Sequence, residues 1–123
     1  RFDVRCAGID APVGSLSGGN MQKVILAREI SVAPKLLLVA EPTRGLDIAA
    51  CALVHEQLAR AAEEGVAVVT LSSDIDELLA ISTRIAVFYG GRTVAVFERV
   101  ADLTAAELGG AMLGVSDEAR EAA

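Results

Sequence analysis

Apolar residues recur at spacings of three and four from Gly18 onward, which predicts an amphipathic helix that ends at Pro34. Ser17 directly precedes this pattern and is a favoured helix N-cap residue. Residues 1–15 show no such period, because glycine and proline interrupt them, and we expect them to be irregular. The helical pattern is carried by Met21, Val24, Ile25 and residues 27–30.

Two short, uninterrupted apolar runs predict strands of a parallel sheet. Residues 36–40 and 66–71 have strand length, and their continuous hydrophobicity is typical of strands that are buried on both faces. A second helix is expected between them, over about residues 49–64. Asp47 is its expected N-cap and Gly65 its expected C-cap.

The rest of the chain predicts a short helix, a hairpin and a last helix. Residues 72–74 (Ser-Ser-Asp) can cap the short helix. The β-branched runs 84–89 and 93–97 flank a Gly-Gly pair, which favours a β-hairpin. Thr104 and Glu107 form a capping box that opens the last helix. The pattern therefore predicts an α/β chain with parallel core strands, helices and a C-terminal β-hairpin.

Composition narrows the classes of function. Of 123 residues, 53% are hydrophobic and 23% charged. This balance excludes the possibility that the chain as a whole is a disordered tail. The net charge of −6 and the lack of a basic stripe exclude a nucleic-acid partner. Cys6 and Cys51 form no paired motif and His55 is the single histidine, so we expect reduced thiols and no metal site. The longest apolar runs fall short of the ~20 residues that a membrane helix needs.

The first cluster that carries chemistry lies at the start of the first helix. Gly18 and Gly19 bring bare backbone N–H groups to a helix N-terminus, where the dipole favours an anion. The Ser17 hydroxyl and the Asn20 amide can add hydrogen bonds to phosphate or ribose oxygens. A simple N-cap with a flexible entry explains these residues as well.

Two further clusters follow the predicted strands. Glu41 comes at the end of the first strand, where a carboxylate in a nucleotide hydrolase can polarise the attacking water or hold Mg²⁺ through a water. An exposed loop carboxylate is the alternative interpretation. Asp47 and residues 72–74 are likewise explained by helix capping alone.

The three clusters occur in an order that is specific in combination. Leu-Ser-Gly-Gly-Asn is followed by a hydrophobic strand ending in Glu-Pro-Thr-Arg-Gly-Leu-Asp, and then by Ser-Ser-Asp-x-x-Glu. Over residues 14–98 the chain resembles the ATPase subunit of ABC transporters, from the signature motif onward. The signature's final Asn, followed by Met-Gln-Lys, resembles the branch that imports simple sugars and nucleosides.

The resemblance implies a partial P-loop NTPase fold of the ABC ATPase type. Residues 1–13 would end the helical subdomain, and residues 14–115 would form the C-terminal part of the ABC ATPase domain, from the signature to the hairpin after the switch position. Residues 116–123 are expected to be a frayed tail.

Site residues follow from the resemblance by position. The signature loop would be Ser17, Gly18, Gly19 and Asn20, which in the family binds the γ-phosphate of an ATP held by the opposite half. Glu41 matches the catalytic glutamate. The D-loop, which couples the two sites across the dimer, would comprise Gly45, Leu46 and Asp47.

Two residues depart from the family pattern. Ala40 stands where an Asp usually organises Mg²⁺, and Ser73 stands where most members place the switch histidine. The phosphate loop GxxxxGK[ST] and the Gln loop do not occur in the chain, and Arg1 rather than Met begins it. These features resemble the C-terminal part of the second, degenerate half of a fused importer ATPase, and we expect a fragment that is an ATPase only within a full-length subunit.

The implied function is to supply the signature loop in trans to ATP, with ATP and Mg²⁺ held mainly by the partner half. The implied partners are the missing N-terminal ATPase portion or a second ATPase half, membrane permease subunits and a solute-binding protein, at the cytoplasmic face of the cell membrane. The alternative is a non-catalytic interaction module that pairs with another ATPase. A translation or DNA-repair ATPase of the same superfamily is disfavoured by the −6 charge.

Overall fold

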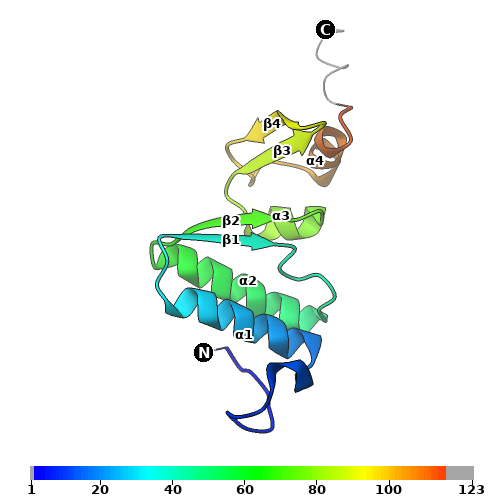
Figure 1. The fold of residues 1–123 in the computed structure, drawn as a ribbon. Coiled ribbons are helices and arrows are strands. Elements are labelled where there is room, and N and C mark those ends of the chain that lie inside the picture. The colour runs from blue at the N-terminus through cyan, green and yellow to red at the C-terminus, as the bar shows by residue number, and fades with distance from the viewer. Residues whose placement is uncertain (1, 116–123) are drawn as a thin grey trace, which may run out of the picture. The chain divides into compact units, whose positions relative to one another are not determined.

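The helices and strands follow one another in the order that the hydrophobic pattern predicts (Figure 1). This computed structural model describes residues 2–115, and the chain divides into two units between Leu71 and Ser72. Residues 116–123, expected to be a frayed tail, lie outside the described residues.

The first unit is a two-stranded parallel sheet with helices on one face. Its strands pair in register from Leu36 opposite Ala67 to Ala40 opposite Leu71. The helix after the first strand packs on the sheet, and the preceding helix lies beside it (Figure 1). The elements are η1 (Val13–Ser15), α1 (Gly18–Ser31), β1 (Leu36–Ala40), α2 (Ile48–Glu63) and β2 (Ala67–Leu71).

The core of this unit lies between the sheet and the helices. Leu37 of β1 is buried, as are Val54 and Leu58 of α2 and Leu26 and Ile30 of α1. These positions recur every three or four residues along each helix, so they form one apolar stripe per helix. The two predicted helices are therefore confirmed, although α1 ends at Ser31, before the predicted stop at Pro34. Within residues 2–15, which were expected to be irregular, the described structure has the short 3₁₀ turn η1.

The prediction that both strands are buried on both faces is wrong within this unit. Leu36 and Leu38 are 59% and 65% exposed, and Val69 and Leu71 are 47% and 52% exposed. Alternate side chains of a strand point to opposite faces of its sheet, and within this unit helices cover only one of those faces. The continuous apolar run therefore leaves one face uncovered.

Polar side chains and glycine set the ends of the second helix. The Asp47 carboxylate accepts a hydrogen bond from the Ala50 N–H at 2.8 Å, which confirms the predicted N-cap of α2. The helix ends at Glu63 with Glu64 as its C-cap, so the prediction that Gly65 is the C-cap is wrong by one residue. Gly65 has a φ of +92°, a left-handed conformation that glycine adopts without steric cost.

The second unit packs two short helices against an antiparallel hairpin. Its elements are α3 (Ile75–Ile81), β3 (Ile85–Tyr89), β4 (Arg92–Phe97) and α4 (Ala105–Met112). The Gly-Gly turn joins β3 to β4, and a bulge interrupts their register between Val87 and Phe88. The buried cluster consists of Leu78, Ile85, Val87, Val100, Leu108 and Ala111. Parallel strands, helices and a hairpin together confirm the predicted α/β class.

Candidate functional site

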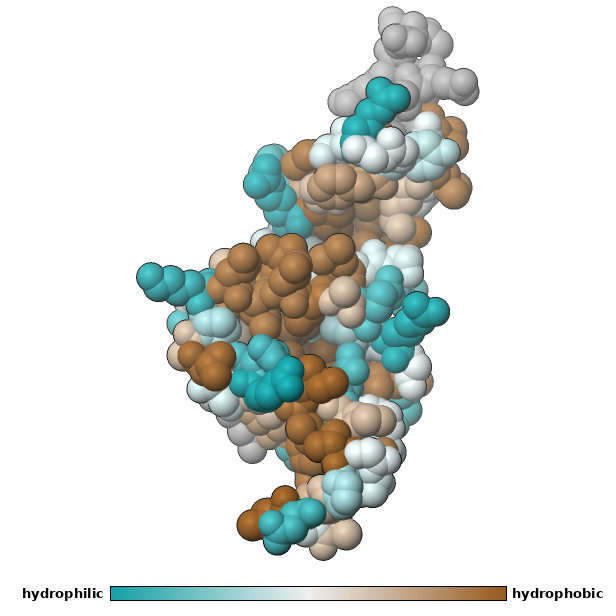
Figure 2. All heavy atoms as spheres, in the orientation of Figure 1, coloured by the Kyte–Doolittle hydropathy of each residue, from teal (hydrophilic) through white to brown (hydrophobic). Residues whose placement is uncertain are grey.

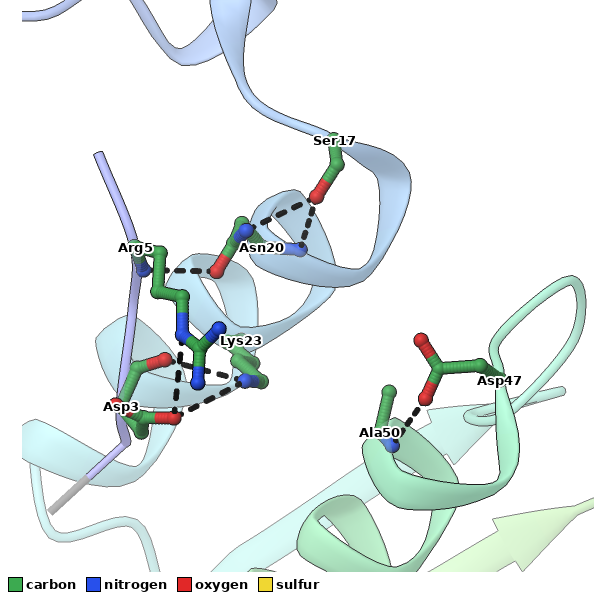
Figure 3. Close-up of polar contacts among 7 residues, drawn as sticks. All are labelled: Asp3, Arg5, Ser17, Asn20, Lys23, Asp47 and Ala50. Carbon is green, nitrogen blue, oxygen red and sulfur yellow. Dashed lines mark hydrogen bonds and ion pairs between the residues drawn. The ribbon is translucent and has the colours of Figure 1, made fainter. Parts of the chain in front are cut away.

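The four predicted signature residues form the first turn of α1 and the residue before it. Ser17 is the N-cap, and its Oγ accepts hydrogen bonds from the Asn20 backbone N–H at 3.4 Å and from Asn20 Nδ2 at 2.9 Å (Figure 3). Ser17 and Gly18 are exposed, whereas Gly19 and Asn20 are half-buried. The N–H groups of Gly18 and Gly19 belong to the first turn, which has no intrahelical acceptors. This turn can therefore receive an anion.

Glu41 directly follows β1, and its backbone has a conformation that residues other than glycine rarely adopt. Its φ is +48°, in the left-handed region that disfavours residues with a Cβ. Its backbone N–H donates to the Leu71 carbonyl at 2.7 Å, and its own carbonyl accepts from the Arg44 N–H at 3.2 Å. The strand ladder thus continues one residue past β1 and holds this strained backbone in place, a feature often found at functional sites.

One hydrogen bond and one close approach place the N-terminal part of α1 beside the loop that contains Glu41. Gln22 on α1 donates from Nε2 to the Pro42 carbonyl at 2.9 Å. A methyl group placed on Gly19 would lie 3.8 Å from Leu46 Cδ2 and 3.8 Å from Ala50 Cβ. The first unit therefore brings together the signature turn, the Glu41 loop and the predicted D-loop.

The predicted D-loop is a turn that leads into α2. Gly45 has a φ of +75°, and the Leu46 N–H donates to the Thr43 carbonyl at 3.0 Å. The Asp47 carboxylate faces the first turn of α2 as its N-cap (Figure 3). The structure shows the capping role of this carboxylate, and the coupling role of Asp47 is kept as a proposal.

Ser73 lies in the second unit, whereas Glu41 and the signature turn lie in the first. Within its own unit, Ser73 is exposed and directly precedes Asp74, the N-cap of α3. The Asp74 carboxylate accepts from the Glu77 N–H at 3.1 Å, and the Ser72 hydroxyl accepts from the Asp74 N–H at 3.1 Å. The Ser-Ser-Asp cluster therefore caps α3 as predicted.

Contacts of the first two turns of α1 with other segments were not predicted from the sequence. The Arg5 N–H donates to Asn20 Oδ1 at 2.8 Å, and Lys23 Nζ lies 3.9 Å from Asp3 Oδ2 (Figure 3). The contact of Gln22 with the Pro42 carbonyl was not predicted either. Residues 2–6 carry no period that could have revealed these contacts, and the Arg5 contact uses the backbone, which leaves no trace in residue type.

The pocket between α1 and β1 is separate from the signature turn. It has a volume of about 180 Å³, and only Gln22 and Glu29 line it with polar side chains. Apolar residues make up the rest of its wall, including Leu37, Ala40 and Pro42. No cationic group faces this pocket, so the exposed first turn of α1 is the better candidate for an anion.

Residues 2–115 offer neither a metal-binding cluster nor a membrane-spanning helix. Within that range, no group of three or more His, Cys, Asp or Glu side chains could hold a metal ion. Ala40 ends β1 and presents a methyl group where the resemblance expects a carboxylate. None of the helices in the same range has both the length and the hydrophobicity to cross a bilayer.

Similar solved structures define the class of fold. MJ1267, described as an ATP-binding cassette of an ABC transporter, superposes with a TM-score of 0.73 over 87% of this chain and 42% of that chain, at 19% identity. Its ADP conformation gives a TM-score of 0.63 over 81% of this chain and 37% of that chain, at 21% identity. The chain therefore has the fold of part of an ATP-binding cassette.

Curated relatives define the branch, although no family model matches the chain. The ribose import ATP-binding protein RbsA 1 of Rhizobium meliloti (strain 1021) is 40% identical over 119 residues, which cover 97% of this chain and 24% of that protein. The nucleoside import ATP-binding protein NupA of Lactococcus lactis subsp. cremoris (strain MG1363) is 52% identical over 91 residues, 74% of this chain and 18% of that protein. The resemblance to ABC ATP-binding subunits of the sugar and nucleoside import branch is thus confirmed.

The match covers a segment of these relatives. The ribose import ATP-binding protein RbsA of Roseobacter denitrificans (strain ATCC 33942 / OCh 114) is 44% identical over 95 residues, which make up 77% of this chain and 19% of that protein. The chain spans about a quarter or less of the length of the three relatives described.

Proposed function

We propose that this chain is a segment of an ABC importer ATPase that supplies its signature loop in trans to ATP held by the other ATPase half. The observation that carries the proposal is the exposed, capped N-terminus of α1, which presents the Ser17 hydroxyl and two glycine N–H groups together. The motif order and the ribose and nucleoside import relatives support it. The solute class that follows is a simple sugar or a nucleoside.

The chemistry of this turn suits a γ-phosphate. Backbone N–H groups at a helix N-terminus stabilise negative charge through their own hydrogen bonds and through the helix dipole. Gly18 and Gly19 have no side chains to keep a phosphate away from these N–H groups. The bound nucleotide supplies the phosphate to be cleaved, and this turn would stabilise the charge that builds up on it.

The ATPase half to which this segment belongs would have a structural or slow site of its own. Ala40 offers no oxygen for Mg²⁺, and Ser73 replaces the expected switch histidine. Glu41 matches the catalytic glutamate, but the Asp expected directly before it and the switch histidine expected after the second strand are both replaced. ATP and Mg²⁺ would therefore be held mainly by the partner half, and this segment would be the C-terminal part of the second half.

The proposed partners follow from the same assignment. They are the N-terminal ATPase portion or a second ATPase half, the membrane permease subunits and a solute-binding protein. The assembly would lie at the cytoplasmic face of the cell membrane, with this segment peripheral to it. No nucleic-acid partner is proposed, because the net charge is −6.

Turnover by two variants of the complete ATP-binding protein tests the proposal. Gly19→Asp would place a carboxylate where the γ-phosphate binds, so ATP turnover should be abolished. Glu41→Gln should leave most of the turnover, since this half's own site contributes little. Gly110→Asp is a matched control, because this helical glycine in the second unit has open space around it and should accept the same change. Near-normal turnover of Gly19→Asp, or an inactive Glu41→Gln, would overturn the assignment.

A second candidate function is a non-catalytic module that pairs with another ATPase. It is favoured by one observation, that no GxxxxGK[ST] phosphate loop occurs in the chain. An immunoblot with an antibody raised against the Ser116–Ala123 sequence distinguishes the two functions. A band far above 12.7 kDa supports the importer ATPase, whereas a band at 12.7 kDa supports the pairing module.

A further inference from the structure

We infer that Asn20 is a positioning residue, held by residues 3–5, that turns the hydroxyl proton of Ser17 outward toward the ligand. Residues 3–5, which contact α1 through Asp3 and Arg5, form the N-terminal brace. This inference rests on the proposed function, because it assigns a role to two residues of the proposed signature loop. In this role Asn20 acts through Ser17 and does not itself contact the nucleotide.

The orientation of the Asn20 amide follows from the chemistry of its neighbour. A backbone N–H can only donate, so the Asn20 atom that lies 2.8 Å from the Arg5 nitrogen must be the acceptor Oδ1. The other end of the amide, Nδ2, then faces Ser17 Oγ at 2.9 Å. Since an amide nitrogen can only donate, Ser17 Oγ is the acceptor in this bond.

The direction of the Ser17 hydroxyl follows in turn. Its oxygen accepts from Asn20 Nδ2 and from the Asn20 backbone N–H, so both lone pairs are used. The hydroxyl proton must then point away from Asn20, and Ser17 is exposed. Ser17 is therefore restricted to donating, which favours a ligand group that only accepts hydrogen bonds, such as a deprotonated phosphate oxygen.

The N-terminal brace holds the Arg5 N–H over the first turn of α1. Lys23 Nζ donates to the Asp3 carbonyl at 3.1 Å and lies 3.9 Å from Asp3 Oδ2, while its own side chain is only 13% exposed. A lysine side chain that is buried to this extent is stabilised when its ammonium has such partners. The Arg5 guanidinium also lies 3.9 Å from Asp3 Oδ2 but is 84% exposed, so its side chain contributes little.

The kinetic test uses Ser17→Ala, Asn20→Asp and the double variant in the complete ATP-binding protein. In Asn20→Asp the new carboxylate would still accept from the Arg5 N–H, but it cannot donate to Ser17, whose proton would turn inward toward it. We expect each single variant to lower kcat by about 10²-fold, the usual effect of losing one donor to developing charge. The double variant should lose no more than either single variant, because both changes remove the same hydrogen bond.

Two outcomes of this kinetic test would overturn the inference. One is an Asn20→Asp variant with the turnover of the unmodified protein. The other is a double variant whose loss is the product of the two single losses, since that result would show that Asn20 and Ser17 act independently.

Hydrogen exchange tests the N-terminal brace without relying on turnover. Arg5→Pro removes the backbone donor, while Arg5→Ala keeps it and removes only the exposed side chain. Lys23→Met removes the contact to Asp3 and provides a second variant in case proline disturbs the backbone. Amide exchange of residues 17–21 should rise at least about tenfold in Arg5→Pro and Lys23→Met and stay unchanged in Arg5→Ala.

The two tests separate the inference from the proposed function. Unchanged exchange in Arg5→Pro and in Lys23→Met would overturn the N-terminal brace, whatever the turnover of these variants. Full turnover in both Ser17→Ala and Gly19→Asp would instead overturn the proposed trans signature, whatever the exchange of residues 17–21.

Discussion

At the scale of single residues, the backbone around Glu41 is fixed from two directions. The Glu41 N–H is bound to the Leu71 carbonyl, and the next carbonyl, that of Pro42, accepts from the Gln22 side chain. A left-handed φ of +48° at a residue with a side chain costs free energy, so it persists only where neighbouring contacts enforce it. Through this bond, the Gln22 side chain on α1 helps to fix the backbone path of the loop that follows Glu41.

This role of Gln22 predicts a measurable loss of stability. Gln22→Met keeps the length of the side chain but removes the donor, so the carbonyl of the buried Pro42 loses its partner. An unsatisfied buried carbonyl costs roughly 1–3 kcal/mol, and we expect the free energy of unfolding to fall by that amount in urea titrations. Arg28→Met on an exposed position of the same helix is the control and should change stability by less than about 0.5 kcal/mol. Equal stability of the two variants would contradict the prediction.

At the scale of elements, Asp47 connects a helix end to a proposed coupling loop. Its carboxylate caps α2, and Asn is as good an N-cap as Asp. Asp47→Asn should therefore keep the thermal stability of the protein, whereas Asp47→Ala should lose about 1 kcal/mol.

Turnover of the Asp47→Asn variant then decides between the two interpretations of this residue. Because the cap is preserved, a coupling role predicts that ATP turnover of the complete protein falls at least about tenfold, a barrier increase of ~1.4 kcal/mol. Turnover equal to that of the unmodified protein would assign Asp47 to capping alone. Thermal unfolding of the same samples verifies that the cap has been kept.

The capping box of α4 predicts a dependence of stability on pH. The Thr104 hydroxyl and backbone N–H donate to the Glu107 carboxylate at 2.6 and 2.9 Å, and these bonds lower the pKa of Glu107 below its ordinary value of 4.5. The folded state thus prefers the ionised form. Its contribution to stability is present above pH 4.5 and is lost as the pH falls through the lower pKa of the folded state.

The measurement is the midpoint of thermal unfolding from about pH 3 to about pH 7, for the unmodified chain and for Glu107→Gln. The glutamine variant cannot titrate at this position, so its unfolding midpoint should fall less steeply in acid. Glu98→Gln is a matched control, because Glu98 forms an exposed ion pair with Arg84 outside the capping box. Identical pH profiles for Glu107→Gln and the unmodified chain would contradict the assigned pKa shift.

Local patterns predicted the elements, because each helix has its own N-cap residue in the sequence. Ser17, Asp47, Asp74 and Thr104 all act as N-caps in the structure, as their positions before apolar periods indicated. The hairpin turn at Gly90 and Gly91 was predicted because a glycine pair lies between two β-branched runs. These features depend on neighbours in sequence, and such neighbours can be read directly from the chain.

Contacts between distant segments could not be predicted in this way. The left-handed backbone of Glu41 depends on the Leu71 carbonyl, far along the chain, and the brace contact depends on the Arg5 N–H, which every residue except proline possesses. The covering of the sheet was mispredicted because a continuous apolar run shows only that both faces are apolar. It does not show which segments of the protein cover them.

At the scale of the whole molecule, the uncovered face of the sheet departs from what is usual in a small domain. Figure 2 shows hydrophobic side chains gathered over β1 and β2, where Leu36, Leu38, Val69 and Leu71 are each about half exposed or more. A group of exposed apolar side chains on one sheet face marks an interaction site or an aggregation hazard. Two strands also have two edges with unpaired backbone groups, which adds to that hazard.

The purified 123-residue chain should therefore associate with itself and bind a hydrophobic dye. Leu38→Lys places a charge at the centre of the uncovered face, and it should lower the weight-average mass in sedimentation and at least halve dye fluorescence. Leu113→Lys is the matched control, because Leu113 is 71% exposed but lies in the second unit. It should leave both readings close to those of the unmodified chain. A monomeric chain that binds no dye, or equal effects of the two lysines, would contradict the view that this sheet face needs a covering layer.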